Sequence, residues 1–157
     1  MRTVVTRDEI MRIYRIHVDA ELAHDSARAA STYCPDGTYR HMPTGLVFKG
    51  REAVRLQYAM SYVSFPDQGF DIAREVLDGD TLVHWGTLTG TAKGAFLGLP
   101  PTGRPIALPF VAAIEFRDGA TAGETLWYDT LTLCEQAGYP FEAVQQASSE
   151  ARRRLGA

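Results

Sequence analysis

The sequence is poor in several features that would assign a protein to a class at once. It has two cysteines in 157 residues, Cys34 and Cys134, and neither stands at a spacing typical of redox or metal-binding motifs. We interpret both as reduced, small hydrophobic side chains. No apolar run approaches the roughly 20 residues of a membrane span, and the amino terminus lacks the apolar core of a signal peptide. These absences predict a soluble, cytoplasmic protein with no membrane partner.

Concentrated positive charge is also lacking. The chain has 16 lysines and arginines against 19 acidic residues, a net charge of -3. We interpret its one basic run, at 152–154, as the solvated face of a terminal helix. Because phosphate binding requires a concentrated positive surface, the composition excludes nucleic acid as a partner.

Signature motifs of cofactor and metal sites are missing as well. The sequence contains no GxGxxG, GxxxxGK or GxSxG segment, the marks of dinucleotide, phosphate and hydrolase sites. Its four histidines, at positions 17, 24, 41 and 84, form no helical HxxxH pair. We therefore expect neither a cofactor nor a bound metal.

The first half of the chain favours helices. Thr6 and Glu9 form a capping-box pattern, and apolar residues then recur on one helical face. Asp25 can cap a second helix, which a Pro-Asp-Gly turn ends. The predicted elements are helices over 7–22, 26–33 and 51–63, and short strands over 38–42 and 46–48.

The second half favours long strands separated by Gly-bearing turns, over 69–77, 81–93, 104–116 and 121–133. Their order predicts sequential antiparallel pairing, and Gly86, Gly90 and Gly94 are expected sites of bending. A last helix follows Pro140, with its inner stripe over 141–155. The length and the 45% hydrophobic content suit a single α+β domain over 1–157. We expect a strongly curved, cone-shaped sheet wrapped by the amino-terminal helices, with an open end that forms a hydrophobic pocket.

Three segments together resemble one family. The runs AxxYCPDGTYRHMPTG, GxxxGTxxGxFLGLPPTGRPI and DGxxxxETLWYDTLTLCEQAG are similar to those of SnoaL-like polyketide cyclases, in the nuclear transport factor 2 (NTF2) superfamily. The resemblance covers 10–138 and implies cofactor-free acid/base chemistry on an apolar, carbonyl-bearing small molecule. In the cyclases, a carboxylate removes a proton beside a carbonyl, and the enolate closes a ring by aldol addition. A departure is Ala92, where many relatives have a histidine.

The resemblance places the acidic residue at Asp129. Strand alternation independently puts Asp129 and Trp127 on the more apolar face of the last strand, with Thr125, Leu131 and Leu133. Burial there would raise the pKa of the carboxyl toward neutrality. The alternative is that Asp129 only accepts structural hydrogen bonds. The opposite face, with Tyr128, Thr130 and Thr132, is a candidate homodimer interface.

Further candidates surround the expected pocket. His41 occupies about the position of the catalytic base in the related ketosteroid isomerases and could assist proton transfer. His17 lies on the apolar face of the first helix, and Tyr14 and Tyr33 could donate hydrogen bonds to an enolate oxygen. Trp85 is expected to form a flat wall, with His84 pointing outward. Four functions stay open: a cyclase, an isomerase or dehydratase of the same fold, a hydrolase that activates water, and a non-catalytic binding or dimerisation module.

Overall fold

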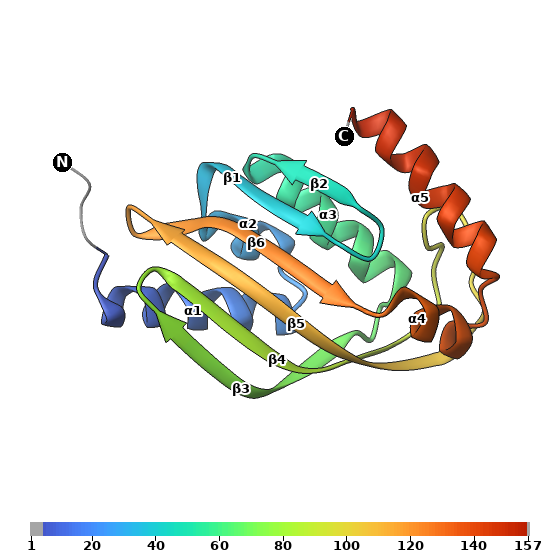
Figure 1. Cartoon of the computed structure of the whole chain (residues 1–157), viewed down its shortest axis with the longest axis horizontal. Helices are drawn as coiled ribbons and strands as arrows, with labels where there is room; N and C mark the ends of the chain where they lie inside the picture. The colour runs from blue at the N-terminus through green and yellow to red at the C-terminus, as the bar shows by residue number, and fades with distance from the viewer. Residues whose placement is uncertain (1–4, 157) are drawn as a thin grey trace.

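The fold consists of a six-stranded curved sheet with helices along one side (Figure 1). The computed structural model describes residues 5–156, so positions 1–4 and 157 of the predicted 1–157 domain lie outside the described residues. In chain order the elements are α1 (Arg7–Leu22), α2 (Ser26–Ser31), β1 (Tyr33–His41), β2 (Leu46–Lys49), α3 (Arg51–Ser64), β3 (Gly69–Asp78), β4 (Thr81–Thr91), β5 (Pro105–Arg117), β6 (Ala120–Tyr128), α4 (Thr130–Ala137) and α5 (Phe141–Leu155).

The strands lie in the order β2-β1-β6-β5-β4-β3. The last four strands of the chain pair sequentially and antiparallel, as predicted. β1 and β2 form a hairpin, and β1 joins the others through a parallel pairing with β6. The helices α1, α2 and α3 pack along one side of this sheet, while α5 reaches from α4 toward β2 (Figure 1). The prediction of an α+β cone with an extra carboxy-terminal helix is therefore confirmed.

Local sequence explains how α1 begins and which face it buries. The hydroxyl of Thr6 accepts a hydrogen bond from the backbone of Glu9, and the carboxylate of Glu9 accepts one from the backbone of Thr6 at 2.8 Å. This reciprocal pair satisfies amide groups that the first turn leaves without partners. The buried face comprises Ile10, Ile13, Tyr14, His17 and Ala20, of which all but Ala20 belong to the predicted stripe, whereas Leu22 at its predicted end is 48% exposed.

The pairing of β3 with β4 is irregular at one of the predicted bends. The register shifts between Ile72 and Arg74, opposite Gly86. A Cβ atom at Gly86 would lie 1.8 Å from the carbonyl oxygen of Asp71, so no other residue fits without moving the backbone. Such an irregularity increases local twist and helps the sheet to curve.

Several predicted boundaries were wrong, including the start of β1, which lies at Tyr33 and not at 38, so the Pro-Asp-Gly segment belongs to this strand. The second helix ends at Ser31 instead of continuing to Tyr33, because Tyr33 already begins β1. The last strand ends at Tyr128 instead of Leu133, because the carboxylate of Asp129 accepts the backbone N–H of Thr132 at 2.8 Å and caps α4. The short helix buries Leu133, Cys134 and Ala137 in an apolar cluster with residues of β5. Burial of that helical face explains why the strand does not continue.

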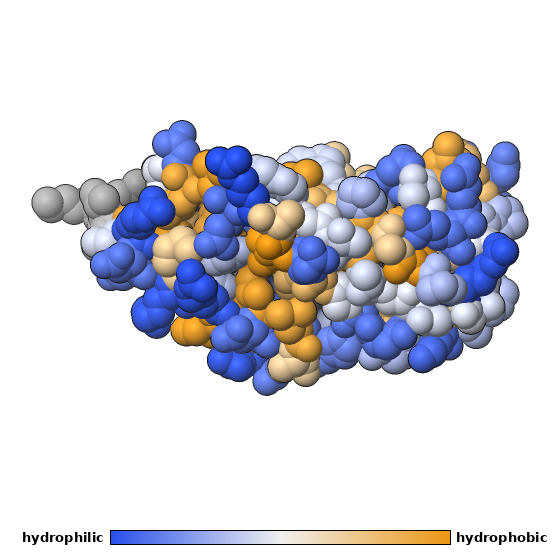
Figure 2. Space-filling model, turned by 90° about the horizontal axis from the view of Figure 1, so that it is seen from below, coloured by the Kyte–Doolittle hydropathy of each residue, from blue (hydrophilic) through white to orange (hydrophobic). Residues whose placement is uncertain are grey.

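The surface shows where apolar side chains remain in contact with solvent. From the side on which β3 lies, apolar residues form a band between hydrophilic regions (Figure 2). Val76 of β3 is 45% exposed.

Within residues 5–156, none of the helices combines the length and apolar character required to cross a membrane.

Candidate active site

A cavity of about 140 Å³ opens between the sheet and the helices. Its walls come mainly from β1, β4, β5, β6 and α3, and no residue of α5 lines it. Most of the lining is apolar, including Phe65, Phe96, Leu108, Phe110 and Leu126. Polar side chains enter this apolar lining at a few points, an arrangement typical of small-molecule sites.

The most connected polar group in the wall is Glu124 of β6, which is 4% exposed. Its Oε2 atom accepts hydrogen bonds from the hydroxyls of Tyr33 and Tyr58, the latter at 2.9 Å, and lies 3.3 Å from Nε2 of His17. The other oxygen, Oε1, has no hydrogen-bond partner among the described residues. It is still accessible to solvent, unlike the unpartnered atoms that are sealed in the interior. Because Glu124 lines the cavity, Oε1 is the oxygen left to meet a ligand.

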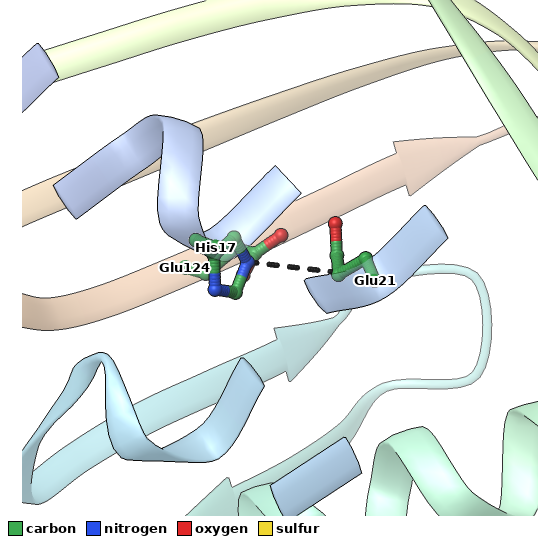
Figure 3. Close-up of side chains that lie close together, drawn as sticks. All are labelled: His17, Glu21 and Glu124. Carbon is green, nitrogen blue, oxygen red and sulfur yellow. Dashed lines mark ion pairs between the residues drawn. The ribbon is translucent and has the colours of Figure 1, made fainter. Parts of the chain in front are cut away.

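His17 of α1 links Glu124 to a second carboxylate. Its Nε2 atom lies 3.6 Å from Oε1 of Glu21, one helical turn further on, and its Nδ1 atom is 2.9 Å from the hydroxyl of Thr32. Figure 3 shows Glu21 and Glu124 close to the same imidazole. Three side chains from α1 and β6 therefore share one buried charge network.

The charges of this network follow from burial and proximity. Burial alone would lower the pKa of His17, but the carboxylates of Glu21 and Glu124 outweigh it and raise that pKa to about 9. Burial raises the pKa of Glu21 to about 7. Burial also opposes ionisation of Glu124, but the hydrogen bond and charge of His17 lower its pKa below the usual value. At neutral pH, Glu124 is thus a carboxylate beside a protonated imidazole.

The same three residues are the one group of described side chains found close enough together to hold a metal ion. Their ligand atoms lie within 4.8 Å of one another. However, Tyr33, Tyr58 and His17 already direct protons or N–H groups at Oε2 of Glu124. A cation would have to displace these donors, so the donor set fits a shared-proton network better than a metal centre.

A second buried polar pair lies on β4 and α1. Nδ1 of His84 is 2.6 Å from the hydroxyl of Tyr14, and His84 lines the cavity. Burial lowers the pKa of His84, so its imidazole is neutral at neutral pH. The prediction that His84 points outward and Trp85 inward is wrong, because His84 lies on the face of β4 that lines the cavity. Trp85 is 37% exposed on the outer face.

His41 lines the cavity at another point. Its Nδ1 atom lies 2.7 Å from the hydroxyl of Thr44, and its Nε2 atom lies 3.1 Å from the hydroxyl of Tyr128. Burial lowers the pKa of His41 to about 4. The imidazole is therefore neutral, and both of its nitrogens are engaged with protein hydroxyls.

Gln57 of α3 is a polar lining residue without a partner. Its side-chain oxygen is buried and accepts no hydrogen bond from any described residue. That oxygen is sealed from solvent, so a ligand cannot reach it, but the amide Nε2 group has no partner among the described residues and is not sealed, so it can donate to a ligand. Gln57 is therefore a candidate ligand contact that the sequence analysis did not identify.

The predicted position of Asp129 is wrong. Its side chain is exposed at the start of α4, and hydrogen bonds from the side chain and backbone of Thr132 lower its pKa, whereas a pocket position would raise it. The inward face of β6 carries Glu124, Leu126 and Tyr128. Trp127 lies on the outer face and is 42% exposed. The predicted assignment of faces was thus reversed along this strand, and Thr130 and Thr132 lie in α4, not on the strand.

Three other predicted residues are buried just behind the cavity wall. His17 and Tyr33 contact Glu124, and Tyr14 contacts His84. The prediction missed Glu124 and Glu21 altogether. One signal was present for each, since Glu124 alternates with Leu126 and Tyr128, and Glu21 follows His17 by one helical turn. Ala92 is fully buried in the apolar cluster beside α4.

Comparisons with solved structures define the class of fold. A protein with a ketosteroid isomerase-like fold from Catenulispora acidiphila, solved with trimethylamine, aligns with a TM-score of 0.72 and 22% identity, covering 83% of this chain and 95% of that one. An NTF2-like protein of unknown function from Burkholderia pseudomallei aligns with a TM-score of 0.68 and 19% identity, covering 82% and 97%. The chain therefore has the NTF2-like cone fold.

The family follows from the sequence profile. The profile of the SnoaL-like polyketide cyclase family matches residues 11–137, and the chain belongs to this family. A protein from Jannaschia sp. CCS1, provisionally described as a SnoaL-like polyketide cyclase, aligns with a TM-score of 0.77 and 20% identity, covering 89% of this chain and 98% of that one. A comparison with curated proteins found no match.

Proposed function

We propose that the protein is a cofactor-free acid/base enzyme in which Glu124 removes a proton from carbon beside a carbonyl of an apolar small molecule. The observation that carries this proposal is a buried carboxylate, kept ionised by His17, whose Oε1 atom meets an apolar cavity. A base surrounded by apolar walls lies close to bound carbon and away from competing water.

The reaction follows from this placement. Glu124 takes the proton, and the electrons of the C–H bond form the enolate. Attack of the enolate on a second carbonyl of the same molecule forms the new ring bond, and the resulting alkoxide takes the proton back from Glu124. No atom is gained or lost, so no further reactant is needed. Membership of the SnoaL-like family favours this cyclase reaction over isomerisation or dehydration, which use the same first step.

The hydroxyls of Tyr33 and Tyr58 support Glu124 from behind. Burial and the charge of Glu124 raise the pKa values of both tyrosines, so both keep their protons and continue to donate. His41 is proposed to act indirectly, by fixing the hydroxyl of Tyr128 at another point of the wall. Together with Gln57, Tyr128 would orient a bound molecule relative to Glu124.

Proton exchange into a simple ketone tests this function without knowledge of the natural substrate. The bicyclic ketone β-tetralone has acidic protons beside its carbonyl, and β-naphthol is a planar mimic of its enol. We expect the protein in deuterium oxide to accelerate loss of these proton signals in NMR spectra, with inhibition by β-naphthol. A protein that binds β-naphthol without accelerating exchange would be a binding module instead.

We also propose that the outer sheet face pairs with a second copy of the chain. Trp85, Val111 and Trp127 are cross-strand neighbours on β4, β5 and β6, and each is at least 37% exposed. Large aromatic side chains in such a row are enriched at interfaces, and a two-fold axis through Val111 would bring two rows together.

A further inference from the structure

His84 and Tyr14 form a buried polar pair that the proposed reaction does not yet use. The two side chains are 3% and 2% exposed, and their hydrogen bond is 2.6 Å long. The ring of His84 packs edge-on against Phe110, with centroids 5.5 Å apart and planes at 86°. Contacts on two sides therefore fix the orientation of this imidazole.

The other ring nitrogen of His84, Nε2, forms no hydrogen bond with any described residue. It remains accessible to solvent. Because His84 lines the cavity and is otherwise buried, Nε2 has access to the cavity.

The proton on His84 can be placed from its surroundings. Burial and the nearby carboxylate of Glu75 raise the pKa of Tyr14, so the phenol keeps its proton. The 2.6 Å contact allows either direction of donation, and we assign the phenol as the donor to Nδ1 because Nδ1 is the one hydrogen-bond partner of this hydroxyl among the described residues. A neutral imidazole that accepts at Nδ1 carries its own proton on Nε2. The charged groups that face His84 are His17 of α1, Glu75 of β3 and Glu124 of β6.

The sheet register sets His84 across from the base. His84, Ala112 and Leu126 are successive cross-strand partners on β4, β5 and β6. Two strand spacings separate the outer pair by about 10 Å, and the small side chain of Ala112 leaves the space between them open. Glu124 lies two residues from Leu126 on the same inward face. A planar ketone between β4 and β6 would thus have an N–H donor on one side and a carboxylate on the other.

We propose that His84 is a further catalytic residue, whose Nε2–H group donates a hydrogen bond to the carbonyl oxygen of the substrate, with Tyr14 as its positioning residue. This proposal rests on the proposed function of Glu124. When Glu124 takes the proton from carbon, the C–H electrons form the carbon–carbon double bond, and the carbonyl π electrons move onto oxygen. The Nε2–H group stabilises that oxygen without giving up its proton, as a preorganised donor does in an oxyanion hole.

The test uses a double variant that is expected to fold. In Tyr14→Phe/His84→Phe both hydrogen-bonding partners become apolar rings of similar shape, which avoids an unpaired buried group. We expect exchange of β-tetralone to slow by roughly 100-fold, mainly in kcat. His84→Gln keeps an N–H group near the position of Nε2 and should recover part of the loss. Tyr14→Phe alone should give an intermediate rate, because the tautomer is then no longer fixed.

An infrared spectrum of bound β-tetralone provides a readout that does not depend on turnover. In the wild-type complex, the carbonyl band should shift to lower frequency, and in the double variant it should return toward its value in apolar solvent. An unshifted wild-type band overturns the assignment of His84, as does normal exchange in a folded double variant. Absence of exchange in the wild type with a shifted band overturns the role of Glu124 alone. Failure of β-tetralone to bind at all would overturn both.

Discussion

The Nε2 atom of His17 lies 3.3 Å from Oε2 of Glu124, and both side chains are almost completely buried. Loss of the charge on His17 would leave Glu124 as an unpaired anion in an apolar interior, which is strongly unfavourable. The ionisation of the candidate base is therefore linked to the stability of the fold.

This link, together with the lowered pKa values of His41 and His84, which make stability fall below about pH 6.5, predicts a stability maximum at about pH 6–7. The pKa of His17 is raised from 6.5 to about 9, so its contribution is complete below pH 6.5 and is lost as the pH rises through about 9. The pKa of Glu21 is raised from 4.5 to about 7, so its contribution also declines with rising pH. The pKa of Glu124 is lowered, so its contribution is present above pH 4.5 and lost in acid. Urea unfolding at a series of pH values measures this profile.

His17→Gln is the matched variant for the pH profile. It keeps a polar side chain but cannot take up a proton, so the decline in unfolding free energy between about pH 7 and 9 should become smaller. A wild-type midpoint that rises steadily from pH 6 to 9 would be inconsistent with a protonated His17.

Replacement of Gln57 should separate stability from binding. Gln57→Leu removes a buried acceptor that has no partner in the described residues, so the free energy of unfolding should stay the same or rise by about 1 kcal/mol. Affinity for β-naphthol, measured by fluorescence titration, should fall roughly tenfold because one ligand hydrogen bond is lost. Ser61→Ala is the control, since the Ser61 hydroxyl already donates to Gln68 at 2.6 Å. Equal losses of affinity in both variants would argue against a ligand contact by Gln57.

Asp129→Ala should affect stability and leave ligand binding intact. The carboxylate caps α4 and lies outside the cavity lining. Loss of the cap should lower the Tm by roughly a few degrees, whereas affinity for β-naphthol should not change. Asp129→Asn, which can still cap the helix, should retain most of the Tm.

The proposed dimer predicts a concentration-dependent change of mass in sedimentation experiments. Val111→Arg places a charge in the middle of the apolar row between Trp85 and Trp127, so it should yield monomers that remain folded. Substitution of Arg153, a terminal-helix residue outside this row, by Ala should leave the dimer intact. A wild-type protein that sediments as a monomer at all concentrations would contradict this interface.

Local sequence signals predicted most of the fold because each acts over a few residues. The capping box at Thr6 and Glu9 and the apolar stripe of α1 gave its observed bounds, Arg7–Leu22. The hairpin turns between the later strands likewise gave the antiparallel order. Such signals require no knowledge of distant contacts.

The candidate site was harder to predict because it depends on which face of each strand turns inward. Trp127 and Leu131 made the wrong face of β6 seem the more apolar, but Leu131 belongs to α4 and Trp127 remains on the surface. Glu124 is buried because α1 and α3 bring His17 and Tyr58 to it from more than 60 residues away. An Asp followed nine residues later by Gly138 could have indicated the helix that ends the strand.

The central claim is that Glu124, and not Asp129, accepts the proton. The most direct measurement compares the rates at which Glu124→Gln and Asp129→Asn exchange the protons of β-tetralone in deuterium oxide. We predict a loss of at least 100-fold in folded Glu124→Gln and a wild-type rate in Asp129→Asn. Wild-type exchange in Glu124→Gln, or its loss in folded Asp129→Asn, would contradict the account.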